Sequence, residues 1–192
     1  MGRPLYDSAG FLEAARVLAS EGGPAAVTVD SVAKYIKAPK GSFYHRFASR
    51  DVLLGRLWLE TALAFQKGFF AAIQAGDGLS AALHMPRWSR AHLDDARLLS
   101  LYSRHDFVQG EWPDELKEGV REQTERLEQC LTKFARDAFG RAGATQVRKS
   151  TFVLFEVPIA AVKGHLERRE APPPLVDELI ARTYNAIVHN TA

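Results

Sequence analysis

The sequence predicts an all-α protein of about nine helices, with an N-terminal three-helix domain over residues 1–50 and a larger helical body over residues 51–192. Apolar residues recur every three or four positions along most of the chain, which is the period of an α-helix. No stretch of appreciable length alternates apolar and polar residues as a strand does. Glycine and proline residues separate the periodic stretches, as at Gly22-Gly23 and at Pro172-Pro173-Pro174.

The composition is that of a globular protein that can bury a substantial core, with 192 residues of which 46% are hydrophobic and 25% charged. The sequence has neither a run of eighteen apolar residues nor the charged and apolar regions of a secretory signal, so we expect a cytoplasmic protein with no membrane partner. The net charge is only +2, but residues 1–56 carry eight Lys or Arg against five Asp or Glu. The single cysteine, Cys130, is expected to be a small buried hydrophobe.

The first two helices are predicted from their ends. The first begins near Asp7 and stops at Gly22-Gly23, where a left-handed cap costs little. Thr28 is a suitable N-cap for a second helix of about two turns. The apolar stripe of that helix is Val29, Val32, Ala33 and Ile36.

A tight turn and a third helix follow. Pro39 disfavours a helical Ala38, but it suits the first position of a new helix because no N–H is needed there. At 100° per residue, Phe43 and Phe47 share one face of this helix. The opposite side carries Gly41, Ser42, His45 and Arg46.

The segment from Lys37 to Arg50 contains four Lys or Arg and no acidic residue, which favours phosphate as a partner. Two short helices joined by a tight turn, with one packed face and one basic face, predict a DNA-reading helix-turn-helix within Val27–Leu54. The expected core of the three-helix domain is Phe11, Ala15, Leu18, Val29, Val32, Ile36, Phe43 and Phe47.

A long fourth helix is predicted directly after this domain, with Ser49 as its N-cap and an end near Gln74. Because no linker follows Phe47, we expect the domain and the body to be rigidly joined. Residues 79–109 predict shorter helical pieces, broken near Pro86 and around residues 92–95.

Three further helices complete the predicted body. Pro113 opens a long helix that ends before Gly140. Another helix runs from Thr145 to about Arg168 with a kink at Pro158, and the last runs from Leu175 to about His189.

The order of residues in the helix-turn-helix resembles that of a known family. The matching segments are Thr-Val-x-x-Val-Ala, Pro39-Lys40-Gly41-Ser42-Phe43-Tyr44-His45-Arg46-Phe47 and Ser49-Arg50-Asp51-x-Leu53-Leu54. This order is similar to the N-terminal domain of the tetracycline-repressor (TetR) family of bacterial transcription regulators, over Asp7 to Leu54. Beyond Leu54, only the helical layout agrees with the family.

The resemblance implies that the third helix enters the major groove of DNA. Thr28 and Tyr44 would then contact phosphates, and Arg50 would be the basic residue at the start of the fourth helix. The candidate DNA-binding residues are Thr28, Lys37, Lys40, Gly41, Ser42, Tyr44, His45, Arg46 and Arg50. Lys37 stands where the family usually has glycine, so we expect an altered turn, or a strained lysine at a cost of about 1 kcal/mol whose charge faces DNA.

The expected function is therefore a ligand-responsive repressor that binds a palindromic operator as a homodimer through its two C-terminal helices. It would bind an unknown small-molecule effector and need no cofactor. Aromatic residues could line the effector site, although each could equally be ordinary core. The candidates are Trp58, Phe65, Trp88, Tyr102, Phe107, Phe134 and Phe155.

Rival functions have weaker support in the sequence. Ser103, His105 and Asp106 are adjacent, but a catalytic triad is defined by spatial roles and not by adjacency. The pairs His84 with His92 and His105 with His165 match no standard metal-ligand spacing. We therefore expect neither an enzyme nor a metal site. The alternative is a helical small-molecule-binding protein or enzyme that retains this architecture without binding an operator.

Overall fold

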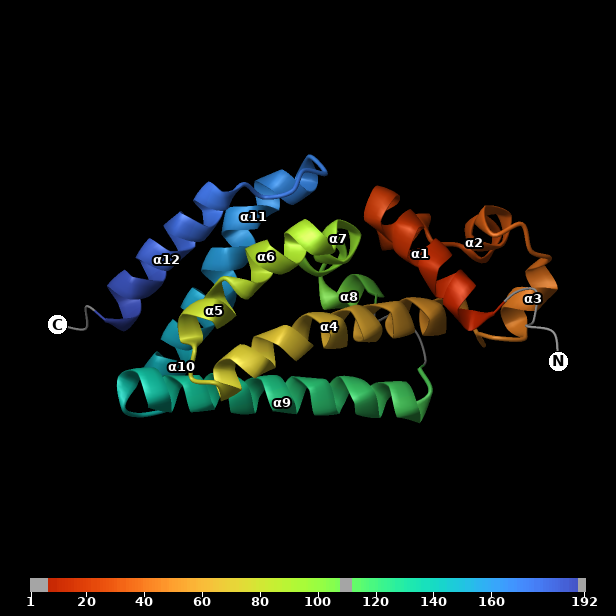
Figure 1. Ribbon diagram of the computed structural model, residues 1–192. Helices are drawn as coiled ribbons and strands as arrows, with labels where there is room; N and C mark the ends of the chain where they lie inside the picture. The colour runs from red at the N-terminus through yellow and green to blue at the C-terminus, as the bar shows by residue number, and fades with distance from the viewer. Residues whose placement is uncertain (1–6, 108–111, 190–192) are drawn as a thin grey trace. The chain divides into compact units, whose positions relative to one another are not determined.

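The computed structural model describes residues 7–107 and 112–189, and every regular element within these ranges is helical (Figure 1). The all-α prediction is therefore confirmed. The helices are α1 to α12, with a 3₁₀ turn, η1, and a π-helical turn, η2. The described residues form two compact units: one holds those up to 62 and those from 97 to 120, and the other holds the rest.

The first unit begins with α1 (Ser8–Gly22), which begins and ends where the sequence predicts and is capped at both ends. The Asp7 Oδ1 atom accepts a hydrogen bond from the Gly10 N–H at 2.9 Å, and Gly23 closes the helix with a φ of 76°. The turn η1 (Pro24–Ala26) leads to α2 (Val29–Tyr35) and α3 (Lys40–Tyr44). Pro39 is the N-cap of α3, whereas the sequence predicted it at the first position within the helix.

Three phenylalanine rings form the centre of the core of the first unit. The ring of Phe11 lies 5.8 Å from that of Phe43 and 6.1 Å from that of Phe47, both edge-on. Of the predicted core, Phe11, Ala15, Val32, Phe43 and Phe47 are buried, and Leu18, Val29 and Ile36 are partly buried against them. The Phe11 ring from α1 therefore packs on the inner face of the helix-turn-helix.

The long helix α4 (Arg50–Gln74) follows at once and contributes residues to both units. The Ser49 Oγ atom accepts a hydrogen bond from the Val52 N–H at 3.2 Å, as expected of an N-cap. Gly76, with a φ of 74°, ends this stretch of helix.

Short helices then occupy the region where the sequence predicts broken pieces. They are α5 (Gly78–Ala82), α6 (His84–Ala91), α7 (Leu93–Leu101) and α8 (Arg104–Phe107). The break at His92 is where it was predicted, but Pro86 lies within the first turn of α6 and not at a break. A proline is tolerated there because the N–H groups of the first turn have no carbonyl partner within the helix, so a missing N–H costs no helical hydrogen bond.

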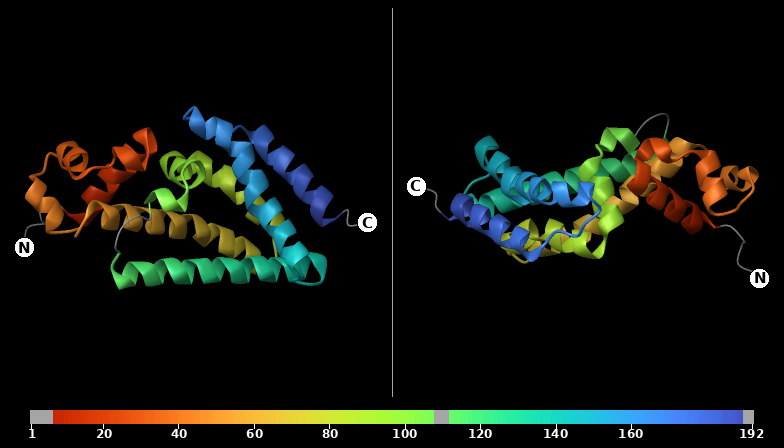
Figure 2. Two further views of the ribbon diagram at one scale, coloured as in Figure 1. Left: turned by 180° about the vertical axis from the view of Figure 1, so that it is seen from behind. Right: turned by 90° about the horizontal axis from the view of Figure 1, so that it is seen from above.

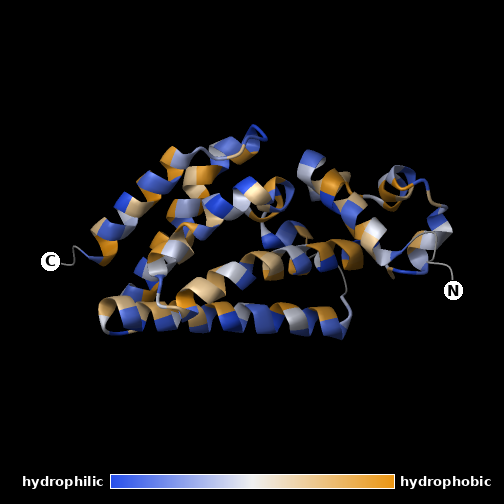
Figure 3. Ribbon diagram, in the orientation of Figure 1, coloured by the Kyte–Doolittle hydropathy of each residue, from blue (hydrophilic) through white to orange (hydrophobic). Residues whose placement is uncertain are grey.

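The long helix α9 (Asp114–Phe139) begins after Pro113 and ends at Gly140, which has a φ of 73°. It alternates polar and apolar positions along its length (Figure 3). No helix in the described ranges has the length and the hydropathy needed to cross a membrane.

The C-terminal part of the second unit is a long helix interrupted by a π-helical turn, followed by a helix that runs back beside it. Helices α10 (Ala144–Thr151) and α11 (Val157–Glu167) are joined by η2 (Phe152–Glu156), and α12 (Pro174–Val188) turns back beside α11 (Figure 2). Helix α12 also packs on α5, and α6 packs on α11. The π turn lies directly before Pro158, whose ring would crowd the carbonyl of Leu154 in a regular α-helix.

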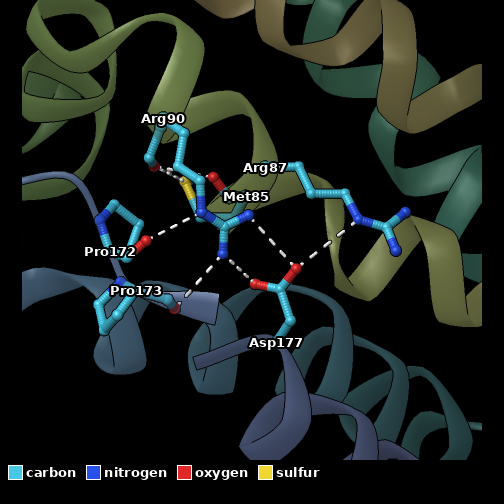
Figure 4. Close-up of polar contacts among 7 residues, drawn as sticks. Met85, Arg87, Arg90, Pro172, Pro173 and Asp177 are labelled. Atoms are coloured by element: carbon cyan, nitrogen blue, oxygen red, sulfur yellow. Dashed lines mark hydrogen bonds and ion pairs between the residues drawn. The ribbon is translucent and has the colours of Figure 1, made fainter. Parts of the chain in front are cut away.

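Arg90 of α6 fastens the start of α12 (Figure 4). Its Nε donates to the Pro172 carbonyl oxygen at 2.9 Å, and its guanidinium also forms an ion pair with Asp177. The Arg87 Nε atom lies 3.8 Å from the same carboxylate. Helix α12 therefore meets α6 through charged hydrogen bonds as well as through apolar contacts.

Candidate functional site

The helix-turn-helix begins with a capping box on α2. The Thr28 Oγ1 atom accepts a hydrogen bond from the Ser31 N–H at 3.0 Å, and the Ser31 Oγ atom accepts one from the Thr28 N–H at 2.8 Å. These two bonds satisfy N–H groups that a helix start leaves unpaired. Thr28 is exposed, so its side chain both caps α2 and faces solvent.

Lys37 closes α2 in the left-handed conformation, with a φ of 56°. The Ala38 N–H donates to the Ala33 carbonyl at 2.9 Å, and the Lys37 N–H donates to the Lys34 carbonyl at 3.2 Å. This bond pattern is a Schellman motif, in which glycine usually occupies the position held here by Lys37. The prediction of a strained lysine in the turn is confirmed.

Helix α3 ends at Tyr44, so His45, Arg46 and Phe47 lie just after the helix and not within it as predicted. The segment 40–47 nevertheless has a buried side and an exposed side. Phe43 and Phe47 are 0% and 1% exposed, whereas Tyr44 is 61% exposed although its ring packs edge-on against Phe43. The other candidates on this segment are also at the surface: Lys40, Gly41, His45 and Arg46 are exposed and Ser42 is half-buried. The segment therefore presents a polar, basic side to solvent.

Lys40 forms an ion pair that the sequence analysis did not anticipate. Its Nζ lies 2.6 Å from the Asp30 Oδ1 atom, and both side chains are about two-thirds exposed. The segment from Lys37 to Arg50 has no acidic residue of its own, but α2 supplies one from its first turn. The helix dipole favours acidic residues at that position, which explains the presence of Asp30. Its ion pair with Lys40 could not be predicted from the sequence.

Arg50 is directed into the first unit. Its Nη2 donates to the Pro24 carbonyl at 2.7 Å, its Nε donates to the Val27 carbonyl, and its Nη1 lies 3.1 Å from an oxygen of Asp51. The side chain therefore fixes the segment before α2 to the start of α4. No local sequence pattern marks this role, because its partners are backbone groups more than twenty residues away.

The predicted effector-site aromatics divide between the two units. Trp58, Tyr102 and Phe107 belong to the first unit, and the rings of Tyr102 and Phe107 lie 6.4 Å apart edge-on. The second unit holds Phe65, Trp88, Phe134 and Phe155. The structure therefore does not bring all seven into one site.

Within the second unit, Phe134 lines a pocket of about 340 Å³. The apolar lining is Ile73, Phe134, Ala138 and Val188. The remaining lining is Gly76, Gly78, Asp137, Tyr184 and His189. Of the seven predicted aromatics only Phe134 is part of it, and Tyr184, Asp137 and His189 were not predicted.

The residues considered for catalysis or metal binding have structural roles in the described part of the chain. Ser103 donates from its N–H and its hydroxyl to one oxygen of Asp106 at 2.6 and 2.8 Å, across the start of α8. The His84 Nε2 atom lies 2.8 Å from the Phe65 carbonyl oxygen, and burial lowers the pKa of His84. Among the described residues, no three His, Cys, Asp or Glu side chains gather as metal ligands.

An all-helical chain with a capped two-helix turn, a buried aromatic side and an exposed basic side falls in the helix-turn-helix class. Residues 11–57 match the family model described as bacterial regulatory proteins of the tetR family, as the resemblance predicted. No curated protein matches the sequence.

Solved structures extend the likeness over the whole chain. FadR from Bacillus subtilis, solved in complex with stearoyl-CoA, is 15% identical, with a TM-score of 0.69 over 97% of this chain and 100% of that one. The fatty acid degradation regulator FadR from Bacillus halodurans is 14% identical, with a TM-score of 0.69 over 100% of this chain and 98% of that one. PfmR from Thermus thermophilus, a TetR-family regulator, is 18% identical, with a TM-score of 0.55 over 95% of this chain and 98% of that one. The chain therefore has the fold of TetR-family transcription regulators.

Proposed function

We propose that this chain is a cytoplasmic, ligand-responsive transcriptional repressor that binds a near-palindromic operator in duplex DNA as a homodimer. The observation that carries the proposal is the segment 40–47, formed by α3 and the turn after it, whose exposed basic side lies opposite two buried phenylalanines within the residues that match the tetR family model. A rigid short helix with this division can insert one side into the major groove while the other stays packed.

The residues of this surface have different roles in the proposal. Lys40, Ser42, His45 and Arg46 read base edges, and Arg or Lys on guanine contributes about 1–3 kcal/mol of discrimination. Thr28 and Tyr44 contact phosphates and so set the register without reading sequence. Lys37 adds positive charge beside the turn. Arg50 orients the segment before α2 through its bonds to the Pro24 and Val27 carbonyls.

A homodimer provides the second recognition helix, because one helix-turn-helix gives limited affinity. Half-sites one helical turn apart require recognition helices about 34–36 Å apart, or a multiple of this distance. Helix α12 offers an apolar surface for pairing, since Leu175 and Leu179 are 58% and 51% exposed and lie one turn apart. We propose that α11 and α12 pair with the same helices of a second copy.

An effector acts through α4 in this proposal. This helix runs unbroken from Arg50, just after the helix-turn-helix, to Gln74, two residues before Gly76 of the pocket. A ligand that prefers one tilt of α4 would change the separation of the two recognition helices. Only a ligand with different affinities for the two arrangements can shift the balance between them.

The test is operator binding by the full chain. Duplex DNA from its own promoter region should bind, with an affinity that falls steeply as salt rises. Arg46→Ala should weaken specific binding more than non-specific binding, whereas Tyr44→Phe should weaken both equally. Lys117→Ala, which removes an exposed lysine of α9, is the control and should change neither.

Two outcomes would contradict the proposal. If neither substitution changes DNA binding, the recognition surface is misplaced. If the chain binds small molecules but no duplex DNA, the alternative of a helical binding protein or enzyme with this architecture is correct.

A further inference from the structure

The pocket in the second unit has apolar lining residues, and two of its aromatic rings can meet only because residue 78 is glycine. A Cβ atom on Gly78 would lie 2.2 Å from the Tyr184 hydroxyl oxygen and 2.3 Å from a ring carbon of Phe134. Because Gly78 has no side chain, both rings can approach the start of α5. Two aromatic rings, 6.3 Å apart, therefore meet in the pocket lining.

The hydroxyl group of Tyr184 has no protein partner among the described residues. The residue is 6% exposed and lines the pocket, yet its hydroxyl makes no hydrogen bond to any of them. Burial raises the pKa of the Tyr184 hydroxyl, and the nearby Asp77 carboxylate raises it further, so the group stays protonated at neutral pH. It is available to a ligand as donor or acceptor.

Among the described residues, the lining of the pocket contains one carboxylate and no Lys or Arg side chain. Asp137 of α9 lies in the lining, and the Asp77 carboxylate is close enough to act on Tyr184. Lys133 pairs with Asp137 and offsets one of these charges, while Arg87 acts on Asp77 from α6. His189 is also a lining residue.

We propose that this pocket binds a small ligand that joins an apolar body to a protonated amine. The apolar body would occupy the floor formed by Ile73, Phe134 and Val188. The ammonium group would face the Tyr184 ring and hydroxyl and the Asp137 carboxylate, where cation–π attraction and a charged hydrogen bond stabilise it. The volume of about 340 Å³ is near the lower end of the ~300–1,000 Å³ range of ligand pockets, which suits a small ligand. This inference rests on the proposed function only in naming the effector class.

The experiment compares three ligands with the same phenylethyl-type skeleton by calorimetric titration of the full chain without DNA. The probes are 2-phenylethylammonium, the neutral 2-phenylethanol and the anionic 3-phenylpropionate. The ammonium should bind at least tenfold more tightly than the alcohol, and the carboxylate most weakly. Equal binding of ammonium and alcohol, preference for the carboxylate, or no binding of any probe would overturn the inference.

Variants locate the site. Asp137→Asn should weaken ammonium binding several-fold and leave alcohol binding unchanged, whereas Asp114→Asn, at the exposed start of the same helix, should change neither. Tyr184→Phe should also weaken ammonium binding, since it removes only the hydroxyl. An unchanged ammonium affinity in both pocket variants would place any binding elsewhere.

A second measurement separates this inference from the proposed function. Operator affinity is measured with and without 2-phenylethylammonium, and with stearoyl-CoA, the ligand in the Bacillus subtilis FadR structure. Binding of the amine with unchanged operator affinity would support the pocket and contradict its role as the effector site. Operator binding without amine binding would support the repressor and contradict the pocket.

Discussion

At the scale of single residues, the ends of three helices show the same backbone geometry with different side chains. Lys37, Arg169 and Gly76 follow α2, α11 and α4 with φ values of 56°, 59° and 74°. In each case the next residue donates its N–H five residues back, as Glu170 does to His165 at 2.9 Å. Strain at Lys37 was predicted only because the TetR family, which this segment resembles, usually has glycine at that position. Nothing in the sequence marked Arg169.

Lys37→Gly should raise the free energy of unfolding by about 1 kcal/mol, because glycine adopts the left-handed conformation without strain. The same change should weaken DNA binding and lower the slope of log affinity against log salt by about one phosphate contact. Urea unfolding and DNA titration at several salt concentrations measure both effects. Arg169→Gly is the matched control, with a similar gain in stability and unchanged DNA binding.

Asp30→Asn should strengthen DNA binding severalfold at low salt. The substitution removes a negative charge beside the recognition helix and frees Lys40 from its 2.6 Å ion pair for a phosphate. The gain should shrink as salt rises, since both side chains are exposed. Glu13→Gln, which breaks an ion pair with Arg16 within α1, is the control. Weaker binding by the Asp30 variant would mean that the pair orients Lys40 on DNA.

At the scale of elements, the sequence predicted best those helices whose ends carry their own signals. Thr28 and Ser49 cap α2 and α4 as expected because capping is a local interaction, and Asp7, near which the first helix was predicted to begin, caps α1 in the same way. Proline was less informative. Pro39 is the N-cap of α3 and Pro86 lies within the first turn of α6, and the sequence does not distinguish these two positions. Neighbours that depend on the fold, such as the carbonyl partners of Arg50, could not be predicted.

Arg90→Met should lower the free energy of unfolding by about 2 kcal/mol. The guanidinium is 29% exposed and donates to Pro172 and Asp177, and hydrogen bonds to charged groups contribute roughly 1.5–3 kcal/mol. Methionine keeps much of the side-chain volume while removing the donors. Thermal and urea unfolding would detect the loss, and Arg136→Met, at an exposed position of α9, should change little. An unchanged stability would mean that α12 is held by apolar contacts alone.

At the scale of the whole molecule, Leu179→Glu should convert a dimer into a monomer at micromolar concentration. It places a charge on the exposed apolar face of α12 while leaving the buried Ile180 and Val176 in place. Operator affinity should fall with dimerisation, and the helical content should not. Sedimentation velocity gives the oligomeric state. Leu63→Glu is the control, because Leu63 is similarly exposed, at 47%, on α4. A variant that stays dimeric would exclude α12 as the interface.

The candidate pocket was the least predictable feature, because its residues come from distant parts of the chain. Ile73, Phe134 and Tyr184 lie on three different helices. Aromatic residues in the sequence identify apolar side chains but do not tell which of them the fold brings together. Trp58 and Phe134, for example, were predicted for one site and belong to different units.

The π turn η2 makes the length of the chain adjustable at one place. One extra residue is accommodated within Phe152–Glu156, because a π turn uses one residue more than an α turn for nearly the same rotation. Removing one residue from this segment would therefore restore regular α-helical winding and leave the buried Val162 and Leu166 of α11 beside their present neighbours. We expect homologous chains that are one residue shorter here to have a regular helix in place of η2.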